Sequence, residues 1–105
     1  MFRFHVVVVS LLMLSSGIAA QTRYTLNGYV KDSLSGETII GATVAVNGLS
    51  RGVTSNQYGF YSLTLDEGEY DIQVSHVSYM GQVVPLHLHS NQTLNFDLLS
   101  KSALI

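Results

Sequence analysis

Apolar side chains recur at every second position through most of the chain after residue 20, in short runs that turn-forming residues separate. Side chains point to alternate faces of a β-strand, so this period predicts strands with one buried face, whereas an amphipathic helix needs a period of about 3.6. About seven such runs follow one another at the spacing typical of an all-β sandwich, and no run has the helical period. The side chains expected to face inward are Leu26, Gly28, Val30, Ala42, Val44, Val46, Tyr61, Leu63, Leu65, Tyr70, Ile72, Val74, Val84, Leu86, Leu88, Leu94, Phe96 and Leu98.

Three features locate turns and an edge in the predicted sandwich. Asn47-Gly48 lies between two apolar runs, and this dipeptide is the strongest short signal for a β-hairpin because both residues tolerate a positive φ. The run 66–69, Asp-Glu-Gly-Glu, predicts a second tight reversal. Pro85 is the only proline, and because it has no backbone N–H to pair, we expect the strand 83–89 at the edge of a sheet.

The first 20 residues have the three parts of a cleavable signal peptide. Arg3 supplies a basic start, residues 6–14 form a short apolar segment, and small residues close the leader before Gln21. The apolar segment is shorter than the ~20 residues that a membrane-spanning helix needs. We favour cleavage after Ala20, with Ala19 as the alternative. A buried N-terminal helix is the competing interpretation, and it is disfavoured because β-branched valines are poor helix formers.

The chain therefore divides into a signal peptide at 1–20, a β-sandwich at 21–98 and a short segment at 99–105. The apolar end of that segment, without a closing turn, is typical of the start of a linker toward a downstream region. The chain has no cysteine, which excludes disulfides, thiolate metal sites and thiol nucleophiles. After the leader, four Lys and Arg face seven Asp and Glu, a formal charge of −3 without a basic patch for nucleic acid or a membrane surface.

The motifs of the common enzyme classes are missing from the sequence. It has no phosphate-binding glycine loop, no nucleophile elbow around a serine and no His-Glu-x-x-His helix. We therefore predict a non-catalytic chain with no catalytic, cofactor-binding or metal-binding residues, exported from the cytoplasm as a mildly acidic module.

Two clusters of potential metal ligands have simpler interpretations. Asp66, Glu67, Glu69 and Asp71 crowd around one turn but lack the regular ligand spacing of a calcium loop, so a solvated turn is favoured. His87 and His89 are two residues apart and share the outward face of one strand, about 7 Å from each other. A third ligand is missing, since His76 lies on the inward register of another strand, and solvated imidazoles on an edge strand are the favoured interpretation.

Exposed aromatic side chains are the remaining candidate surface. Tyr29, Tyr58, Phe60 and Tyr79 fall outside the inward registers. Aromatic residues on a β surface can stack on sugar rings or anchor a protein interface. Because these four are spread over different strands and turns, cross-strand packing or a protein contact is favoured over a ligand platform.

Six short motifs carry a resemblance to a known module. They are Gly28-Tyr29-Val30-Lys31-Asp32, Ser35-Gly36-Glu37, Ile40-Gly41-Ala42-Thr43-Val44, Arg51-Gly52-Val53-Thr54-Ser55-Asn56, Tyr58-Gly59-Phe60-Tyr61-Ser62-Leu63 and Gly68-Glu69-Tyr70. Together they resemble the carboxypeptidase regulatory-like domain, a transthyretin-like or immunoglobulin-like sandwich. The form they resemble stands at the N-terminus of TonB-dependent outer-membrane receptors of the SusC-like type, and the likeness runs from about Tyr24 to Leu98. Ser78-Tyr79 departs from it, because the family usually has Gly-Tyr there.

The resemblance implies a periplasmic N-terminal extension domain, or a fragment of one, with an accessory or regulatory role in nutrient uptake through the outer membrane of a Gram-negative bacterium. Its partners would then be the downstream plug and barrel of the same receptor and the TonB energy-transduction system. The alternative is a binding or spacer module of a secreted peptidase or a cell-surface adhesin. The residues that follow position 105 would discriminate between the two.

Overall fold

The computed structural model describes residues 22–105, and the predicted signal peptide lies outside them. The fold is all-β, as the alternation predicted. Its strands are β1 (Arg23–Asp32), β2 (Thr43–Val46), β3 (Gly52–Thr54), β4 (Phe60–Asp66), β5 (Gly68–His76), β6 (Tyr79–Leu88), β7 (Gln92–Thr93) and β8 (Phe96–Leu98), followed by the short 3-10 helix η1 (Lys101–Leu104). No helix in this described part of the chain is long and apolar enough to cross a membrane.

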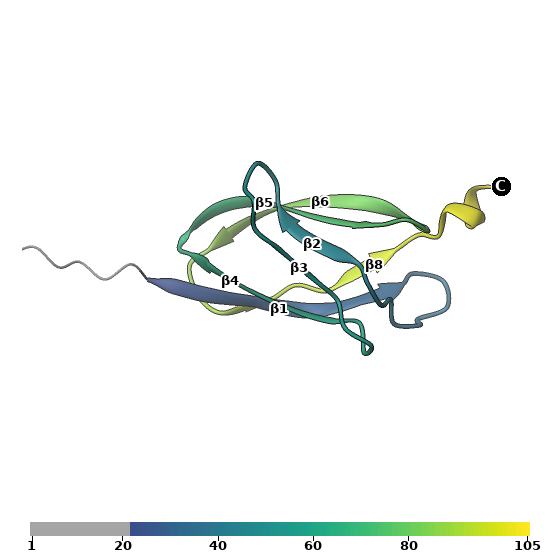
Figure 1. The fold of residues 1–105 in the computed structure, drawn as a ribbon, viewed down its shortest axis with the longest axis horizontal. Helices are drawn as coiled ribbons and strands as arrows, with labels where there is room; N and C mark the ends of the chain where they lie inside the picture. The colour runs from purple at the N-terminus through teal and green to yellow at the C-terminus, as the bar shows by residue number, and fades with distance from the viewer. Residues whose placement is uncertain (1–21) are drawn as a thin grey trace, which may run out of the picture.

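The strands form two sheets that face each other as a sandwich (Figure 1). In the first sheet β4 pairs antiparallel with β1, and β7 and β8 pair parallel with the other side of β1. The second sheet has the order β3-β2-β5-β6, with antiparallel neighbours throughout. The ten-residue β1 therefore holds the whole first sheet together, whereas β2 and β5 share the centre of the second.

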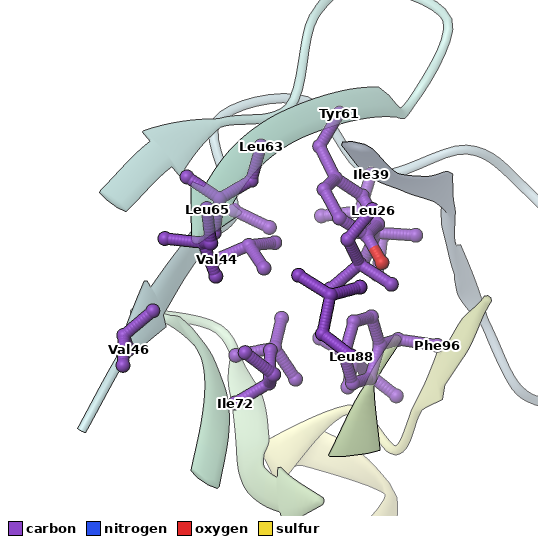
Figure 2. Packing of buried hydrophobic residues seen from close by; sticks show 14 residues of the cluster. Leu26, Ile39, Val44, Val46, Tyr61, Leu63, Leu65, Ile72, Leu88 and Phe96 are labelled. Carbon is purple, nitrogen blue, oxygen red and sulfur yellow. The ribbon is translucent and has the colours of Figure 1, made fainter. Parts of the chain in front are cut away.

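The core between the sheets is built mostly from side chains that the alternation placed inward, and Ile39 of the β1–β2 loop joins it without having been predicted (Figure 2). The longer strands contribute in steps of two, and Ala42, Val44 and Val46 around β2 are likewise buried while the residues between them are not. Full burial of one such aliphatic side chain stabilises the fold by roughly 1.5–3 kcal/mol. Without disulfides, this apolar interior and the backbone ladders supply the stability.

The last apolar run forms two short strands where one was expected. β7 and β8 both lie along β1, but the chain leaves the ladder between them at Leu94 and Asn95. There the Asn95 side-chain oxygen accepts the Tyr29 N–H at 2.9 Å, while the Leu94 N–H donates to Asn27 at 2.8 Å. A side chain thus replaces one ladder bond, which is why the described strands number eight and not seven.

Asn47-Gly48 does lie in the hairpin between β2 and β3, but the turn geometry differs from the two-residue form that the dipeptide favours. Only Gly48 has a positive φ, 83°, among these two residues. The Leu49 N–H donates to Val46 at 3.2 Å, and the next closing bond joins Val46 N–H to Arg51. One positive φ at the third turn position is typical of a type II turn, and the longer loop gives it room.

Pro85 lies on β6, and β6 is the edge of its sheet, as predicted. The register pairs Pro85 with Asp71 of β5. The Asp71 carbonyl accepts the Asn47 N–H from the other side at 2.9 Å, so Asp71 and Pro85 form a pair without hydrogen bonds between them. The missing N–H of Pro85 therefore faces away from the sheet, where no ladder bond is lost.

The Ser78-Tyr79 reversal, where the motif departs from the family pattern, forms without a glycine. No non-glycine residue in the described range 22–105 has a positive φ. Instead the β5–β6 register shifts between Val74 and His76, and the Ser78 N–H donates to the His76 ring at 3.1 Å. The bulge absorbs the curvature that a left-handed glycine would otherwise supply.

Candidate interaction surface

The two sheets are joined by a polar contact at the end of the sandwich where the chain leaves it. The Tyr79 hydroxyl, at the start of β6, donates to a carboxylate oxygen of Asp32 at the end of β1, at 2.9 Å. The other oxygen of Asp32 accepts the backbone N–H groups of Leu34 and Ser35, at 2.8 and 3.1 Å. Asp32 thereby shapes the loop that follows β1 and ties it to the opposite sheet.

The electrostatics of this pair follow from its hydrogen bonds. The Ser35 N–H, then the Leu34 N–H and the Tyr79 hydroxyl, stabilise the carboxylate and lower the pKa of Asp32 below its ordinary value. The same bond to Asp32 raises the pKa of Tyr79, because the charged carboxylate opposes loss of the phenolic proton. Both groups are therefore held in the forms that keep the bond, over the neutral pH range.

The C-terminal segment closes over the same end of the molecule. Leu99 accepts the Met80 N–H at 2.8 Å, and the Lys101 N–H donates to Ser78 at 3.0 Å, around a bridge between Tyr79 and Ser100. The segment therefore passes from β8 in the first sheet to the edge of β6 in the second. The predicted domain boundary after residue 98 stays a prediction.

Large apolar side chains stand exposed on the loops around this end, and we call Leu34, Ile40, Val77 and Leu104 the exit-end surface. Val77 is 86% exposed and Leu34 is 74% exposed, although both are apolar. The His76 ring joins two of these loops by a 3.2 Å contact between Nε2 and the Ile40 carbonyl. Figure 1 shows the C-terminus at this end, opposite the start of β1.

Exposed apolar residues that cluster on structured loops are typical of an interaction surface. Single exposed apolar residues are common, but here three elements present four of them at one end of the sandwich: the β1–β2 loop with Leu34 and Ile40, the β5–β6 turn with Val77, and η1 with Leu104. The arrangement is suited to contact with another protein domain.

The acidic turn residues are spread out by the strand geometry. Asp66 pairs with Arg23 at 3.5 Å between the two side chains, which are about half exposed, and Glu67 lies in the turn itself. Glu69 and Asp71 follow on β5, both exposed on the outer face. Within residues 22–105 no three His, Asp or Glu side chains lie close enough together to hold a metal ion.

The histidines are placed only in part as their spacing predicted, because β6 ends at Leu88 and His89 lies beyond the strand. His87 is exposed on β6 and His89 follows the strand, with ring centroids 5.0 Å apart and His89 Nδ1 3.1 Å from the His87 carbonyl. His76 is not near them, since it bonds to Ile40 and Ser78 at the exit end. The three rings therefore do not converge on one point.

Two of the four predicted surface aromatics pack on each other. Tyr29 of β1 and Phe60 of β4 are direct cross-strand partners, with an edge-to-face contact at 5.4 Å between ring centroids. The Lys31 ammonium lies 5.9 Å from the Tyr29 ring centre. Tyr79 belongs to the Asp32 contact, and Tyr58 stays exposed in the turn before β4. The contact between Tyr29 and Phe60 is cross-strand packing of the kind that the favoured interpretation expected.

The exit-end surface was missed by the sequence reasoning. A signal was present, because Leu34 and Val77 are apolar residues inside turn segments and outside every inward register. The Asp-Ser-Leu-Ser sequence at 32–35 is also a pattern in which an aspartate caps its own turn. What the sequence lacks is any local indication that the two loops meet in space.

Comparisons with known proteins identify a domain family for the sequence and solved structures with a similar fold. The CarboxypepD_reg-like domain family matches residues 26–105. The chain is 36% identical over 92 residues to the TonB-dependent receptor SusC of Bacteroides thetaiotaomicron, an alignment that covers 83% of this chain and 9% of that receptor. The chain thus spans about a tenth of the length of the curated relative that it matches.

Solved structures with the same fold come from varied proteins. A DUF3823 family protein from Parabacteroides merdae superimposes with a TM-score of 0.58 at 16% identity, over 77% of this chain and 48% of that one. A cohesin-X-dockerin complex from Acetivibrio cellulolyticus gives 0.61 at 16% identity, over 72% and 56%. Hydroxyquinol 1,2-dioxygenase from Pseudomonas putida gives 0.62 at 10% identity, over 80% and 58%. At such identities the likeness shows the fold alone.

Proposed function

Because this chain belongs to the CarboxypepD_reg-like domain family, we propose that it is the periplasmic N-terminal extension domain of a TonB-dependent outer-membrane receptor. The family membership confirms the resemblance that the sequence motifs indicated. The observation that carries the proposal is the 36% identity to the receptor SusC over most of this chain. In this proposal the domain has an accessory or regulatory role in nutrient uptake and no catalytic activity.

The exit-end surface supports a contact with the downstream receptor domains. Its exposed apolar residues lie around η1, and in this proposal the next receptor domain would follow η1 and lie within reach of Val77 and Leu34. Attachment by a short segment raises the effective concentration of the two surfaces, so a modest apolar patch is enough for a stable contact. The plug of the same receptor is therefore the proposed neighbour, with the TonB energy-transduction system as a further partner.

The proposed location follows from the leader and from the family. The segment 1–20 has the composition of a signal peptide, and a receptor of this kind would hold the domain on the periplasmic side of the outer membrane. N-terminal sequencing of the exported product is expected to start at Gln21. A product that begins at Met1 and stays in the cytoplasm would contradict the location.

Site-specific photocrosslinking in the intact receptor tests the contact. A photoreactive amino acid at Val77 or Leu34 is expected to crosslink within the same polypeptide to the plug, as located by mass spectrometry of the digest. The matched control is Glu67, which is also exposed but lies in the β4–β5 turn at the opposite end of the sandwich. Equal crosslinking from Glu67, or none from Val77 and Leu34, would count against the proposal.

The accessory role is tested by removal of the domain. Deletion of residues 24–98 from the receptor is expected to lower uptake of its substrate while the barrel is still inserted in the outer membrane. Surface labelling of the barrel provides the control for insertion. Unchanged uptake at equal surface amounts would show that the domain has no role in transport under the conditions used.

A further inference from the structure

Local contacts cover parts of the sheet edges, whereas one stretch of β6 has no backbone partner on its outer side among the described residues. On β4, Asn56 bonds to both the N–H and the carbonyl of Phe60, and Arg51 donates to the Thr64 carbonyl at 2.8 Å. The start of β6 is covered by residues 99–101. The remainder of β6, from Val83 to His87, is an edge that no described residue pairs with, and we call it the open edge.

The register shows which backbone groups this edge presents. Asp71 and Pro85 form a pair without mutual hydrogen bonds, as the bond from Asn47 to Asp71 shows. By the antiparallel alternation, Val83 and His87 also turn their backbone groups away from β5. The N–H and carbonyl of Val83, the carbonyl of Pro85 and the N–H of His87 thus point outward, without partners among the described residues. The Val83 side chain is 54% exposed.

The interior side of the open edge is incompletely covered. Val84 and Leu86 of β6 are only half-buried, as is Leu94 between β7 and β8. Gln92 of β7 pairs with Leu26, whose side chain is fully buried, so Gln92 also faces inward. Its side-chain oxygen is buried without a hydrogen-bond partner. A buried amide oxygen without a hydrogen-bond partner is unusual in native proteins.

The outer face beside the open edge carries negative charge. A shallow groove is lined there by Leu49, Glu69, Asp71, Pro85 and His87, among other residues, and none of the residues that line it is Lys or Arg. Glu69 and Asp71 lie on β5 directly opposite His87 and Pro85. The two carboxylates therefore flank the edge on the side where the outward side chains of an added strand would lie.

We propose that the open edge binds an extended, basic segment of another protein by β-strand addition. The segment would pair with the free groups of Val83, Pro85 and His87 and alternate basic with apolar residues. Its basic side chains would lie beside Glu69 and Asp71, and its apolar ones would cover Val84 and Leu86. Main-chain bonds supply affinity in such binding, and the alternating side chains supply specificity.

A second copy of this chain is a poorer occupant. Antiparallel pairing of two β6 edges with Pro85 opposite Pro85 removes two ladder bonds at the centre, because neither proline has an N–H. Such pairing also brings Glu69 and Asp71 of one copy toward those of the other. Like charges suppress such a pairing, whereas a basic strand is attracted. The inference does not depend on the receptor assignment.

The test uses an acetylated, amidated heptapeptide that alternates Lys and Val, with an alternating Glu and Val peptide as control. We expect the Lys/Val peptide to bind the purified chain and to protect the Val83 and His87 amides from hydrogen exchange, as measured by NMR. Binding of the Glu/Val peptide at equal strength would overturn the proposal. Protection confined to other strands, or dimerisation through the open edge in light scattering, would also overturn it.

Variants separate the backbone and charge contributions. Val83→Pro removes an outward N–H that has no partner within the sheet, so we expect an affinity loss of about tenfold or more with little change in melting temperature. E69Q with D71N is expected to weaken binding and to flatten its salt dependence. The matched control is Glu37→Gln in the β1–β2 loop, which should bind as the parent does. The proposal is refuted if Val83→Pro and the double variant both bind the Lys/Val peptide as tightly as the parent does. If one variant folds poorly, the affinity of the other variant still tests the proposal.

Discussion

The Tyr79 hydroxyl donates to the Asp32 carboxylate at 2.9 Å and so connects the start of β6 with the end of β1, 47 residues apart in the chain. It is a side-chain bond between the two facing sheets. Because Asp32 also caps the loop that carries Leu34, the contact links the packing of the sandwich to the shape of the exit-end surface. A change at either residue should therefore affect both stability and the loop.

Asp32 makes the stability of the domain depend on pH. The pKa of Asp32 is lower in the folded protein than its ordinary value of 3.8, so the folded state favours the charged form. The stabilisation is present above the unfolded pKa and is lost as the pH falls through 3.8 and below. We expect Asp32→Asn to lose less stability than the parent between pH 5 and pH 3, as measured by urea unfolding. An identical pH dependence for the two proteins would contradict this.

Gly28 should not accept any side chain. A Cβ there would lie 2.0 Å from the Leu94 carbonyl oxygen, which is backbone and cannot move aside alone. We expect Gly28→Ala to cost at least about 2 kcal/mol of unfolding free energy, because the overlap must shift β1 or the β7–β8 connection. The control is Gly36→Ala, which has open space but a φ of 75° and so pays only for the left-handed conformation. Equal losses would show that Leu94 is not the obstacle.

Ser55 is the one polar residue in the buried set of the described chain, and its hydroxyl is fully used. It donates to the Ile39 carbonyl at 2.7 Å and accepts the Ala42 N–H at 2.9 Å. We expect Ser55→Ala to destabilise the domain by about 1–3 kcal/mol, because two buried backbone groups lose their partner. Ser62→Ala, at an exposed position of β4, is the comparison and should stay within about 0.5 kcal/mol of the parent. Thermal denaturation of both variants checks the difference.

Tyr61 combines apolar packing with one polar bond. Its ring packs at 5.9 Å from the Phe96 ring centre, and its hydroxyl donates to the Leu94 carbonyl. Burial raises the pKa of Tyr61 above its ordinary value. We expect Tyr61→Phe to cost about 1 kcal/mol, the net value of one such bond, and Tyr61→Ala about 3–5 kcal/mol, since the ring leaves a cavity. Chemical denaturation measures both, and similar losses for Phe and Ala would refute the assignment of the ring to the core.

Several features of the fold follow from the residues in order along the chain. Leu26, Val44 and Ile72 are buried because a strand sends alternate side chains to one face, and this period is visible without any partner strand. Pro85 at an edge follows in the same way, from a missing donor that no central strand can accommodate. The motifs from Gly28 to Tyr70 were likewise enough to indicate the family, because they consist of residues that the turns between the strands require.

Only the tertiary structure decided which strands are neighbours and which surfaces remain open. Asp32 and Tyr79, which are in contact, are far apart in the chain, and so are Leu34 and Val77 of the exit-end surface. The backbone of Val83 is unpaired because its strand lies at the edge of the sheet. The physical reason is that strand pairing uses backbone groups that every residue carries, so the side-chain pattern specifies a buried face but not the partner. The strand pairing is determined by the requirement that all inward faces are buried together. The open edge of β6 is a consequence of that packing.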